Sequence, residues 1–309
     1  MSLNRRGFLK AIGAIGSSSL IGNYSKAIAQ EHFPGYPDRL GVLHDIPLCI
    51  GCRKCEWACK DQNKFPNKPI ETFDDKSIFE QKRRTDEESY TVVNRYPNPK
   101  DKGKPFYVKT QCNHCDEPAC ASACLVKALN KTPEGAVIYN KDICIGCRYC
   151  MTACPFYVPA YEYHNALTPQ IRKCTLCYER IIKKGEIPAC VKICPTQALT
   201  FGKRSELIKL AREKIRSKPG EYIDHIYGER EVGGTCWLYI SGVPFDKLGF
   251  PMDVGTKPYP ELTRGFLTMV PAVLVIWPAL LGGFYMFTKH REEMLKEKEI
   301  IPEKKEEQV

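Results

Sequence analysis

The sequence predicts an α+β fold with one membrane-spanning helix near its C-terminus. Four groups of four cysteines lie between residues 49 and 194, and residues that favour short strands, tight turns and short helices follow them. Two of these groups, "CIGCRKCEWACK" at 49–60 and "CIGCRYCMTACP" at 144–155, share their spacing and most residues, so the chain contains an internal repeat. A long apolar run without charge near the end of the chain predicts the membrane helix.

The first 29 residues have the features of an export signal. Arg5 and Arg6 are adjacent in "NRRGFLK", which matches the twin-arginine pattern, and the weakly apolar stretch after them is too short to span a bilayer. The small residues Ala27–Ala29 fit a cleavage site. We expect a twin-arginine signal peptide over 1–29, a route that exports proteins already folded around their cofactors. The alternative is a basic amphipathic N-terminus without a targeting role.

Residues 30–203 are expected to form the cysteine-rich domain. A Pro/Gly-rich start leads into a short apolar strand, "LGVLHD", before the first cysteine group. The segment 60–111 contains polar runs such as "KRRTDEE" and "YPNPKDKGKP", so we interpret it as a surface insertion, either a docking element or simply a solvated face. The turn residues Pro133–Gly135 separate two β-like runs and predict a hairpin, and "QALTFG" predicts a further strand.

The C-terminal third is expected to connect this domain to a membrane. Residues 204–263 form an extension with a helix in "SELIKLAREKI" and a strand in "WLYISGVPF". The stretch Gly265–Phe287 holds 23 residues without charge, which measures about 34 Å as a helix, so a span over 264–288 is predicted. More basic residues follow the span than directly precede it, which favours a cytoplasmic location for the charged tail 289–309 and places the cysteine domain outside. A buried helix of a soluble protein is the alternative.

Sixteen of the 17 cysteines fall into four groups with related spacing. Groups one and three have the spacing C-x2-C-x2-C-x3-C, in which three thiolates hold one [4Fe–4S] cluster and the fourth ligates another, as in bacterial ferredoxins. Groups two and four lengthen one loop and can bind in the same way. The groups are, in order, Cys49, Cys52, Cys55 and Cys59; Cys112, Cys115, Cys120 and Cys124; Cys144, Cys147, Cys150 and Cys154; and Cys174, Cys177, Cys190 and Cys194.

Structural zinc and disulfides are the alternatives for these cysteines. Zinc sites use two close cysteine pairs with a longer loop between them, and only group four has that shape. An odd number of cysteines leaves one over in a disulfide framework, and a chain of 309 residues needs no disulfides to bury a core. The spacing therefore favours iron–sulfur clusters over both.

The net charge does not indicate a nucleic-acid partner. The formal charge is +10, and residues 1–29 contribute four basic residues and no acid. The remaining 42 basic and 36 acidic residues give +6, and four oxidised clusters with their thiolates, each about −2, would bring the protein near neutrality. We therefore expect no nucleic-acid binding.

The order of the cysteine groups, with "CIGCRYCMTACPFYVP" third and a split fourth group, resembles the four-cluster subunits of respiratory oxidoreductases. These include the β subunits of formate dehydrogenase, dimethyl-sulfoxide reductase and polysulfide reductase. The resemblance covers roughly residues 41–203. Together with "GGTCWLYISGVPF", the twin-arginine start and the single C-terminal span, the chain is most similar to the membrane-anchored iron–sulfur subunit of Hyb-type periplasmic nickel–iron hydrogenases.

The resemblance implies two pseudo-twofold units, each like a bacterial dicluster ferredoxin with insertions, one from groups one and four and one from groups two and three. It also implies which cysteines share a cluster. The sets are Cys49, Cys52, Cys55 and Cys194; Cys174, Cys177, Cys190 and Cys59; Cys112, Cys115, Cys120 and Cys154; and Cys144, Cys147, Cys150 and Cys124. All sixteen positions are cysteine, so four [4Fe–4S] clusters are expected.

The resemblance further implies an electron-transfer subunit without catalysis of its own. Its clusters would pass electrons between an exported catalytic subunit, like that of a nickel–iron hydrogenase, and a polytopic membrane subunit that reacts with quinone. The partner could instead be a molybdenum or tungsten oxidoreductase of the formate dehydrogenase type, or a multihaem cytochrome c. No Ser/His/Asp set, phosphate loop or dinucleotide fingerprint points to an active site.

Five further residues carry lesser hypotheses. Cys236 has no partner group, so we expect a buried thiol that packs as a small apolar side chain. His114 lies between two cysteines of a complete set and is not expected to bind metal. Arg53, Lys54 and Arg148 lie within cluster loops, where they either raise reduction potentials or are solvated.

Overall fold

The computed structural model describes residues 35–101 and 103–300, so the predicted signal peptide over 1–29 lies outside the described residues. The chain divides into two compact units, and the unit that carries the cysteines covers Gln30–Glu261. The second unit contains most of the long C-terminal helix and is treated separately below.

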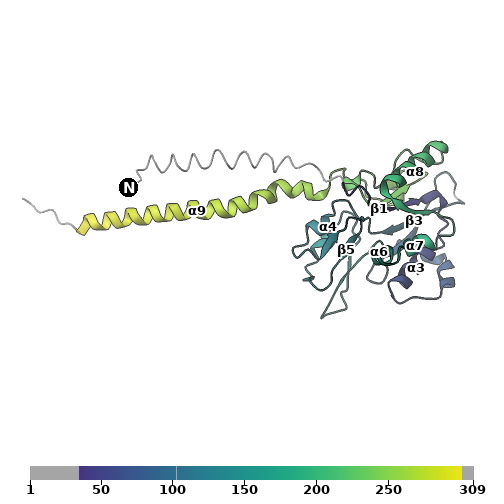
Figure 1. Cartoon of the computed structure of the whole chain (residues 1–309), viewed down its shortest axis with the longest axis horizontal. Helices are drawn as coiled ribbons and strands as arrows, with labels where there is room; N and C mark the ends of the chain where they lie inside the picture. The colour runs from purple at the N-terminus through teal and green to yellow at the C-terminus, as the bar shows by residue number, and fades with distance from the viewer. Residues whose placement is uncertain (1–34, 102, 301–309) are drawn as a thin grey trace, which may run out of the picture. The chain divides into compact units, whose positions relative to one another are not determined.

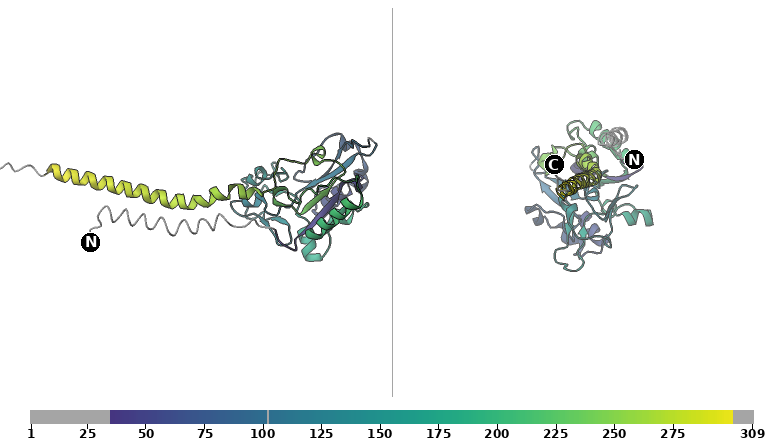
Figure 2. Two further views of the ribbon diagram at one scale, coloured as in Figure 1. Left: turned by 90° about the horizontal axis from the view of Figure 1, so that it is seen from above. Right: turned by 90° about the vertical axis from the view of Figure 1, so that its left-hand side faces the viewer.

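A three-stranded sheet lies at the centre of the cysteine-bearing unit (Figure 1). Strand β1 (Leu40–Asp45) pairs antiparallel with β8 (Leu199–Lys203) and parallel with β9 (Trp237–Ile240). Helix α8 (Arg204–Ser217) packs against all three strands, and Figure 2 shows it beside the purple β1 strand. The three strands and the helix confirm the elements predicted from "LGVLHD", "QALTFG", "WLYISGVPF" and "SELIKLAREKI".

The predicted hairpin is also present. Strand β4 (Leu129–Lys131) pairs antiparallel with β5 (Val137–Tyr139), and Thr132 N–H donates to Ala136 O at 2.8 Å to close the turn. A shorter pair, β6 (Ala160–Tyr161) and β7 (Ile171–Arg172), follows the third cysteine group.

The interpretation of 60–111 as a surface insertion is wrong for two of its segments. Strands β2 (Thr91–Tyr96) and β3 (Phe106–Gln111) pair along their whole length, and most of their side chains are buried. The polar runs that suggested a surface lie mainly outside the strands, in exposed loops around η2 (Ile70–Asp74) and η3 (Ser77–Glu80) and in the β2–β3 connection. The hairpin itself forms part of the core.

Short helices carry many of the cysteines and pack in two pairs. Helix α3 packs against α7 (Figure 1), and α4 packs against α5. The first pair comes from groups one and four, and the second from groups two and three. The helices are α3 (Lys54–Gln62), α4 (Ala119–Ser122), α5 (Tyr149–Thr152), α6 (Tyr178–Lys184) and α7 (Ala189–Lys192). The 3-10 turns η1 (Ile46–Leu48), η4 (Glu231–Gly233) and η5 (Phe245–Leu248) complete the unit.

The C-terminal helix α9 (Tyr259–Ile300) is long and apolar enough to cross a membrane, judged by length and composition. It begins before the predicted span at 264–288 and continues beyond it. The extra turns at its end run through a Lys- and Glu-rich sequence, and both residue types favour helix. A helix of this composition is compatible with membrane anchoring.

Candidate metal centre

The four cysteine groups share one local backbone geometry. The residue two positions after the first cysteine of each group has a positive φ angle; these residues are Gly51, His114, Gly146 and Leu176. The bend turns backbone amides toward the sulfur. Gly146 N–H donates to Cys144 Sγ at 3.5 Å, and Leu176 N–H donates to Cys174 Sγ at 3.4 Å. Such donors stabilise the thiolate, the form of cysteine that binds metal.

The last cysteine of each group lies within a helix or two residues after one, where further donors reach its sulfur. Ala128 N–H donates to Cys124 Sγ at 3.1 Å. The side-chain amide of Asn63 donates to Cys59 Sγ at 3.6 Å. Cys154 accepts backbone hydrogen bonds from residues 156–158. The repeated donors around first and last cysteines show that the loops are shaped for anionic sulfur rather than for disulfides, and all 17 cysteines are free.

In the half of the unit built around β1 and β8, cysteines of groups one and four lie close together. Burial, followed by the charges of Cys194 and Cys52, raises the pKa of Cys49 to about 12. Burial also raises the pKa of Cys59, and the next largest causes are the charges of Cys174 and Cys190, not those of its own group. The fourth cysteine of each group is thus a neighbour of the other group.

The half built around β4 and β5 repeats this exchange between groups two and three. The pKa of Cys115 is raised by burial and then by the charge of Cys154. The pKa of Cys150 is raised to about 11 by burial and by the charges of thiols that include Cys124. Several thiolates this close together repel one another, so they need a cationic group between them.

Two of the four sets enclose a void. One void is lined by cysteines of the first set and by His44. A second void is lined by cysteines of the third set and by Lys173. The lining cysteines are Cys49, Cys52, Cys55 and Cys194 in the first void, and Cys112, Cys115, Cys120 and Cys154 in the second. A space bounded by four thiols with amide donors on their sulfurs fits a [4Fe–4S] cluster.

Other donors near these voids also fit an anionic, sulfur-containing group. His44 is only 1% exposed, yet neither of its ring nitrogens has a hydrogen-bond partner. His114 accepts a hydrogen bond at Nδ1 from Val137 N–H, so its buried Nε2 carries the proton and has no protein acceptor.

Two buried lysines beside the cysteines were missed by the sequence reasoning. Lys109 and Lys173 are 2% and 3% exposed. Lys173 donates to the carbonyl oxygens of Val137 and Cys174. A signal for Lys109 was present in its position within "FYVKTQC", an alternating run that leads directly into the second cysteine group.

The loop cations named from the sequence behave differently from one another. Arg53 is buried, and its guanidinium donates to Glu56 Oε2 at 3.2 Å, so neither solvation nor a free charge describes it. Arg148 is exposed and lies over the rings of Tyr161 and Tyr163. Lys54 is half-buried at the start of α3.

Cys236 is fully buried, as expected, but it is not simply apolar packing. Its thiol donates to Gly135 O at 3.3 Å and accepts a hydrogen bond from Lys131 Nζ at 3.3 Å. This contact joins β9 to the turn of the β4–β5 hairpin and so links the two halves of the unit.

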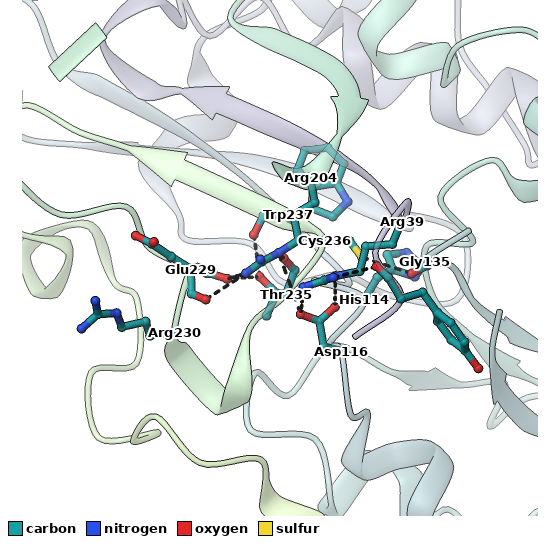
Figure 3. A network of polar contacts seen from close by, with 12 residues as sticks. Arg39, His114, Asp116, Gly135, Arg204, Glu229, Arg230, Thr235, Cys236 and Trp237 are labelled. Carbon is teal, nitrogen blue, oxygen red and sulfur yellow. Dashed lines mark hydrogen bonds and ion pairs between the residues drawn. The ribbon is translucent and has the colours of Figure 1, made fainter. Parts of the chain in front are cut away.

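A buried ion pair next to Cys236 makes the same link (Figure 3). Asp116 follows Cys115 in the second cysteine loop, and its Oδ1 lies 2.7 Å from Arg39 Nε. Arg39 Nη2 also donates to Asp116 Oδ2 at 2.9 Å, so the pair joins one hydrogen bond to a second close approach of opposite charges. Arg204, the first residue of α8, lies 3.9 Å from the same carboxylate and donates to the Thr235 carbonyl oxygen at 2.7 Å.

Comparisons with known proteins agree with this geometry. The model of the family described as "4Fe-4S dicluster domain" matches residues 104–204. A protein of Nitratidesulfovibrio vulgaris (strain Hildenborough) is 52% identical over 299 residues, which cover 96% of this chain and 80% of the relative. Hydrogenase-2 operon protein HybA of Escherichia coli O157:H7 is 37% identical over 279 residues, covering 81% and 84%.

A third relative broadens the family. The iron-sulfur subunit of nitrate-inducible formate dehydrogenase from Escherichia coli (strain K12) is 32% identical over 245 residues, which cover 77% of this chain and 81% of the relative. The cofactors that this family holds are [4Fe–4S] clusters, and sixteen grouped cysteines provide four thiolates for each of four clusters. The chain therefore belongs to the ferredoxin-type [4Fe–4S] subunits of respiratory oxidoreductases.

Proposed function

We propose that this chain relays electrons between an exported catalytic subunit, of the nickel–iron hydrogenase type, and a quinone-reactive subunit in the membrane. The observation that carries the proposal is the exchange of fourth cysteines between groups, which gives four sets of thiols in one compact unit. When bound, [4Fe–4S] clusters accept and release single electrons. The similarity to a hydrogenase-2 operon protein supports the choice of catalytic partner.

Each cluster takes three cysteines from one group and the fourth from another. The two pseudo-twofold units correspond to the halves around β1–β8 with α3 and α7, and around β4–β5 with α4 and α5. The proposed ligand sets are Cys49, Cys52, Cys55 and Cys194; Cys174, Cys177, Cys190 and Cys59; Cys112, Cys115, Cys120 and Cys154; and Cys144, Cys147, Cys150 and Cys124.

The protein contributes position and electrostatics rather than catalysis. Buried strands and paired helices fix the distance between sets, and amide donors on the sulfurs favour the more negative, reduced clusters. Among the sixteen grouped cysteines only Cys147 is exposed, so its set lies nearest the surface, where electrons can pass to or from a partner.

The membrane assignment rests on α9 and on the sequence. The helix anchors the chain by a single pass, the charged tail lies in the cytoplasm, and the cluster domain lies on the outer face. In this arrangement the cluster domain lies on the same side as an exported catalytic subunit, and α9 contacts the polytopic membrane subunit.

A second candidate function follows from the similarity to the iron-sulfur subunit of formate dehydrogenase. The chain would then serve a molybdenum or tungsten oxidoreductase with the same cluster arrangement. Isolation of the intact complex from native membranes, followed by identification of its subunits, separates the two. Recovery of a nickel–iron catalytic subunit supports the first function, and recovery of a molybdopterin subunit supports the second.

Two double variants test the ligand sets. Cys49→Ala with Cys194→Ala removes two ligands of one proposed cluster and should cost about four iron atoms per chain, since each cluster holds four. Cys49→Ala with Cys59→Ala removes one ligand from each of two clusters and should cost about eight. If each group instead bound its own cluster, the two iron losses would be reversed.

A further inference from the structure

Lys109 is a buried cation without a carboxylate partner among the described residues. It lies on β3, is 2% exposed, and its Nζ donates to Gln111 Oε1 at 2.8 Å. The same nitrogen lies 4.3 Å from the centre of the Trp237 ring. A buried ammonium is unfavourable unless a negative charge compensates it, and one amide oxygen and one aromatic ring provide only partial charges.

The compensating charges are the thiolates of two different cysteine sets. Lys109 lines the void of the first set. Its charge also lowers the pKa of Cys59 and Cys174, which belong to the second set, in opposition to burial. The ammonium therefore borders the first set and lies within electrostatic range of cysteines of the second.

A chain of hydrogen bonds holds the partner of Lys109 in place. Gln111 Nε2 donates to the Tyr239 hydroxyl at 2.6 Å, which orients Gln111 Oε1 toward the lysine. The Tyr239 hydroxyl donates in turn to Asn113 Oδ1 at 3.2 Å, in the second cysteine loop. The position of the ammonium is thus fixed by residues of two strands, β3 and β9.

We propose that Lys109 is the shared counter-ion of the two clusters held by groups one and four and raises the reduction potentials of both. A fixed positive charge stabilises the reduced cluster, which carries one more negative charge than the oxidised one. Because the same ammonium faces both clusters, it favours electron entry into this pair. The inference rests on the proposed ligand sets.

The test is a reductive titration of the full chain with its clusters in detergent, followed by electron paramagnetic resonance. Lys109→Met removes the charge and keeps the length of the side chain. At the potential that half-reduces each of the two clusters in the wild type, we expect the reduced-to-oxidised ratio to fall at least tenfold, or about 59 mV for one electron. The other two clusters should change by less than about threefold.

Two control variants separate charge from packing. Lys109→Arg keeps the charge and should titrate like the wild type. Lys76→Met removes an exposed lysine that also acts on Cys49, and water should screen its effect to less than about threefold. Unchanged potentials in Lys109→Met with full iron content would overturn the proposal. So would a shift of one cluster only, or an equal shift in Lys109→Arg.

Loss of clusters is also an interpretable outcome. The counter-ion role is supported if Lys109→Met loses about eight iron atoms, all from these two clusters, while Lys109→Arg retains them. Iron loss from the other two clusters contradicts it. If Lys109→Met does not fold, Lys109→Gln is titrated under the same criteria. The iron counts of the paired cysteine variants test the ligand sets separately, so an error there is distinguishable from an error about Lys109.

Discussion

Replacing Asp116 by Asn should weaken the junction between the two halves of the cysteine-bearing unit. The carboxylate is 1% exposed and pairs with Arg39, and Arg204 and Lys131 lie within 4 Å as well. The substitution keeps the size of the side chain and removes the negative charge that these three cations share. Three buried positive charges would then remain together in a region of low dielectric constant.

The expected cost follows from the burial of the pair. Removing one partner of a buried ion pair costs about 3–5 kcal/mol, because the other partner is left uncompensated. With a urea dependence of about 2–3 kcal/mol per molar for a domain of this size, the midpoint should fall by about 1–2 M. The assay is anaerobic urea unfolding of the full chain in detergent, followed by the visible absorbance of the clusters.

The control is a surface pair on the same sheet. Lys203 Nζ lies 2.8 Å from Asp38 Oδ1, but the two side chains are 50% and 79% exposed. Asp38→Asn should therefore cost less than about 1 kcal/mol. The reasoning is refuted if Asp116→Asn unfolds at the same urea concentration as Asp38→Asn or the wild type.

Three further predictions concern other parts of the chain. Burial raises the pKa of the Cys236 thiol above its usual 9.0, so native protein should resist alkylation of Cys236 by iodoacetamide up to about pH 9. Detection of alkylated Cys236 by mass spectrometry below that pH would contradict this prediction. Gly135 has φ +98°, and Gly135→Ala would place a methyl group 2.8 Å from Leu40 O. In urea unfolding it should therefore lose more stability than Gly255→Ala, which also has a positive φ but nothing within 4 Å of the added methyl group. Deletion of residues 265–309 should move the protein from the membrane fraction to the soluble fraction, and retention in the membrane would show a second anchor.

Much of the fold was predictable because its signals are local. The turn at Pro133–Gly135 predicts the β4–β5 hairpin without knowledge of anything distant, and the helical spacing of α8 is contained in its own sequence. The backbone bend and amide donors near the first cysteine of a group are equally local, since they come from one short segment. The hairpin and α8 match their predictions.

The core role of β2 and β3 was not predictable in the same way. Each strand is short, and the connection between them is polar and carries Lys100 and Lys104, so the whole segment resembles surface. Burial of Val92 and Val108 depends on contacts with segments elsewhere in the chain. Sequence patterns report such contacts poorly, because burial is decided by tertiary packing.

The charge contacts around the cysteines could not be predicted from the sequence for a related reason. Arg53 was visible as a charge in a cysteine loop, but the sequence does not show that Glu56, which neutralises it, also pairs with Arg83. Lys109 lies more than 50 residues from Cys55 and more than 60 from Cys174, so nothing in the local sequence connects it to either thiol. Long-range charge placement emerges only from the fold.

The most direct test of the account is the iron and acid-labile sulfide content of the full chain, assembled under anaerobic conditions. Four [4Fe–4S] clusters predict about sixteen iron atoms and sixteen sulfide ions per chain, with no stoichiometric zinc. About four zinc atoms per chain and no sulfide would contradict the assignment of the cysteines on which the proposed electron relay depends.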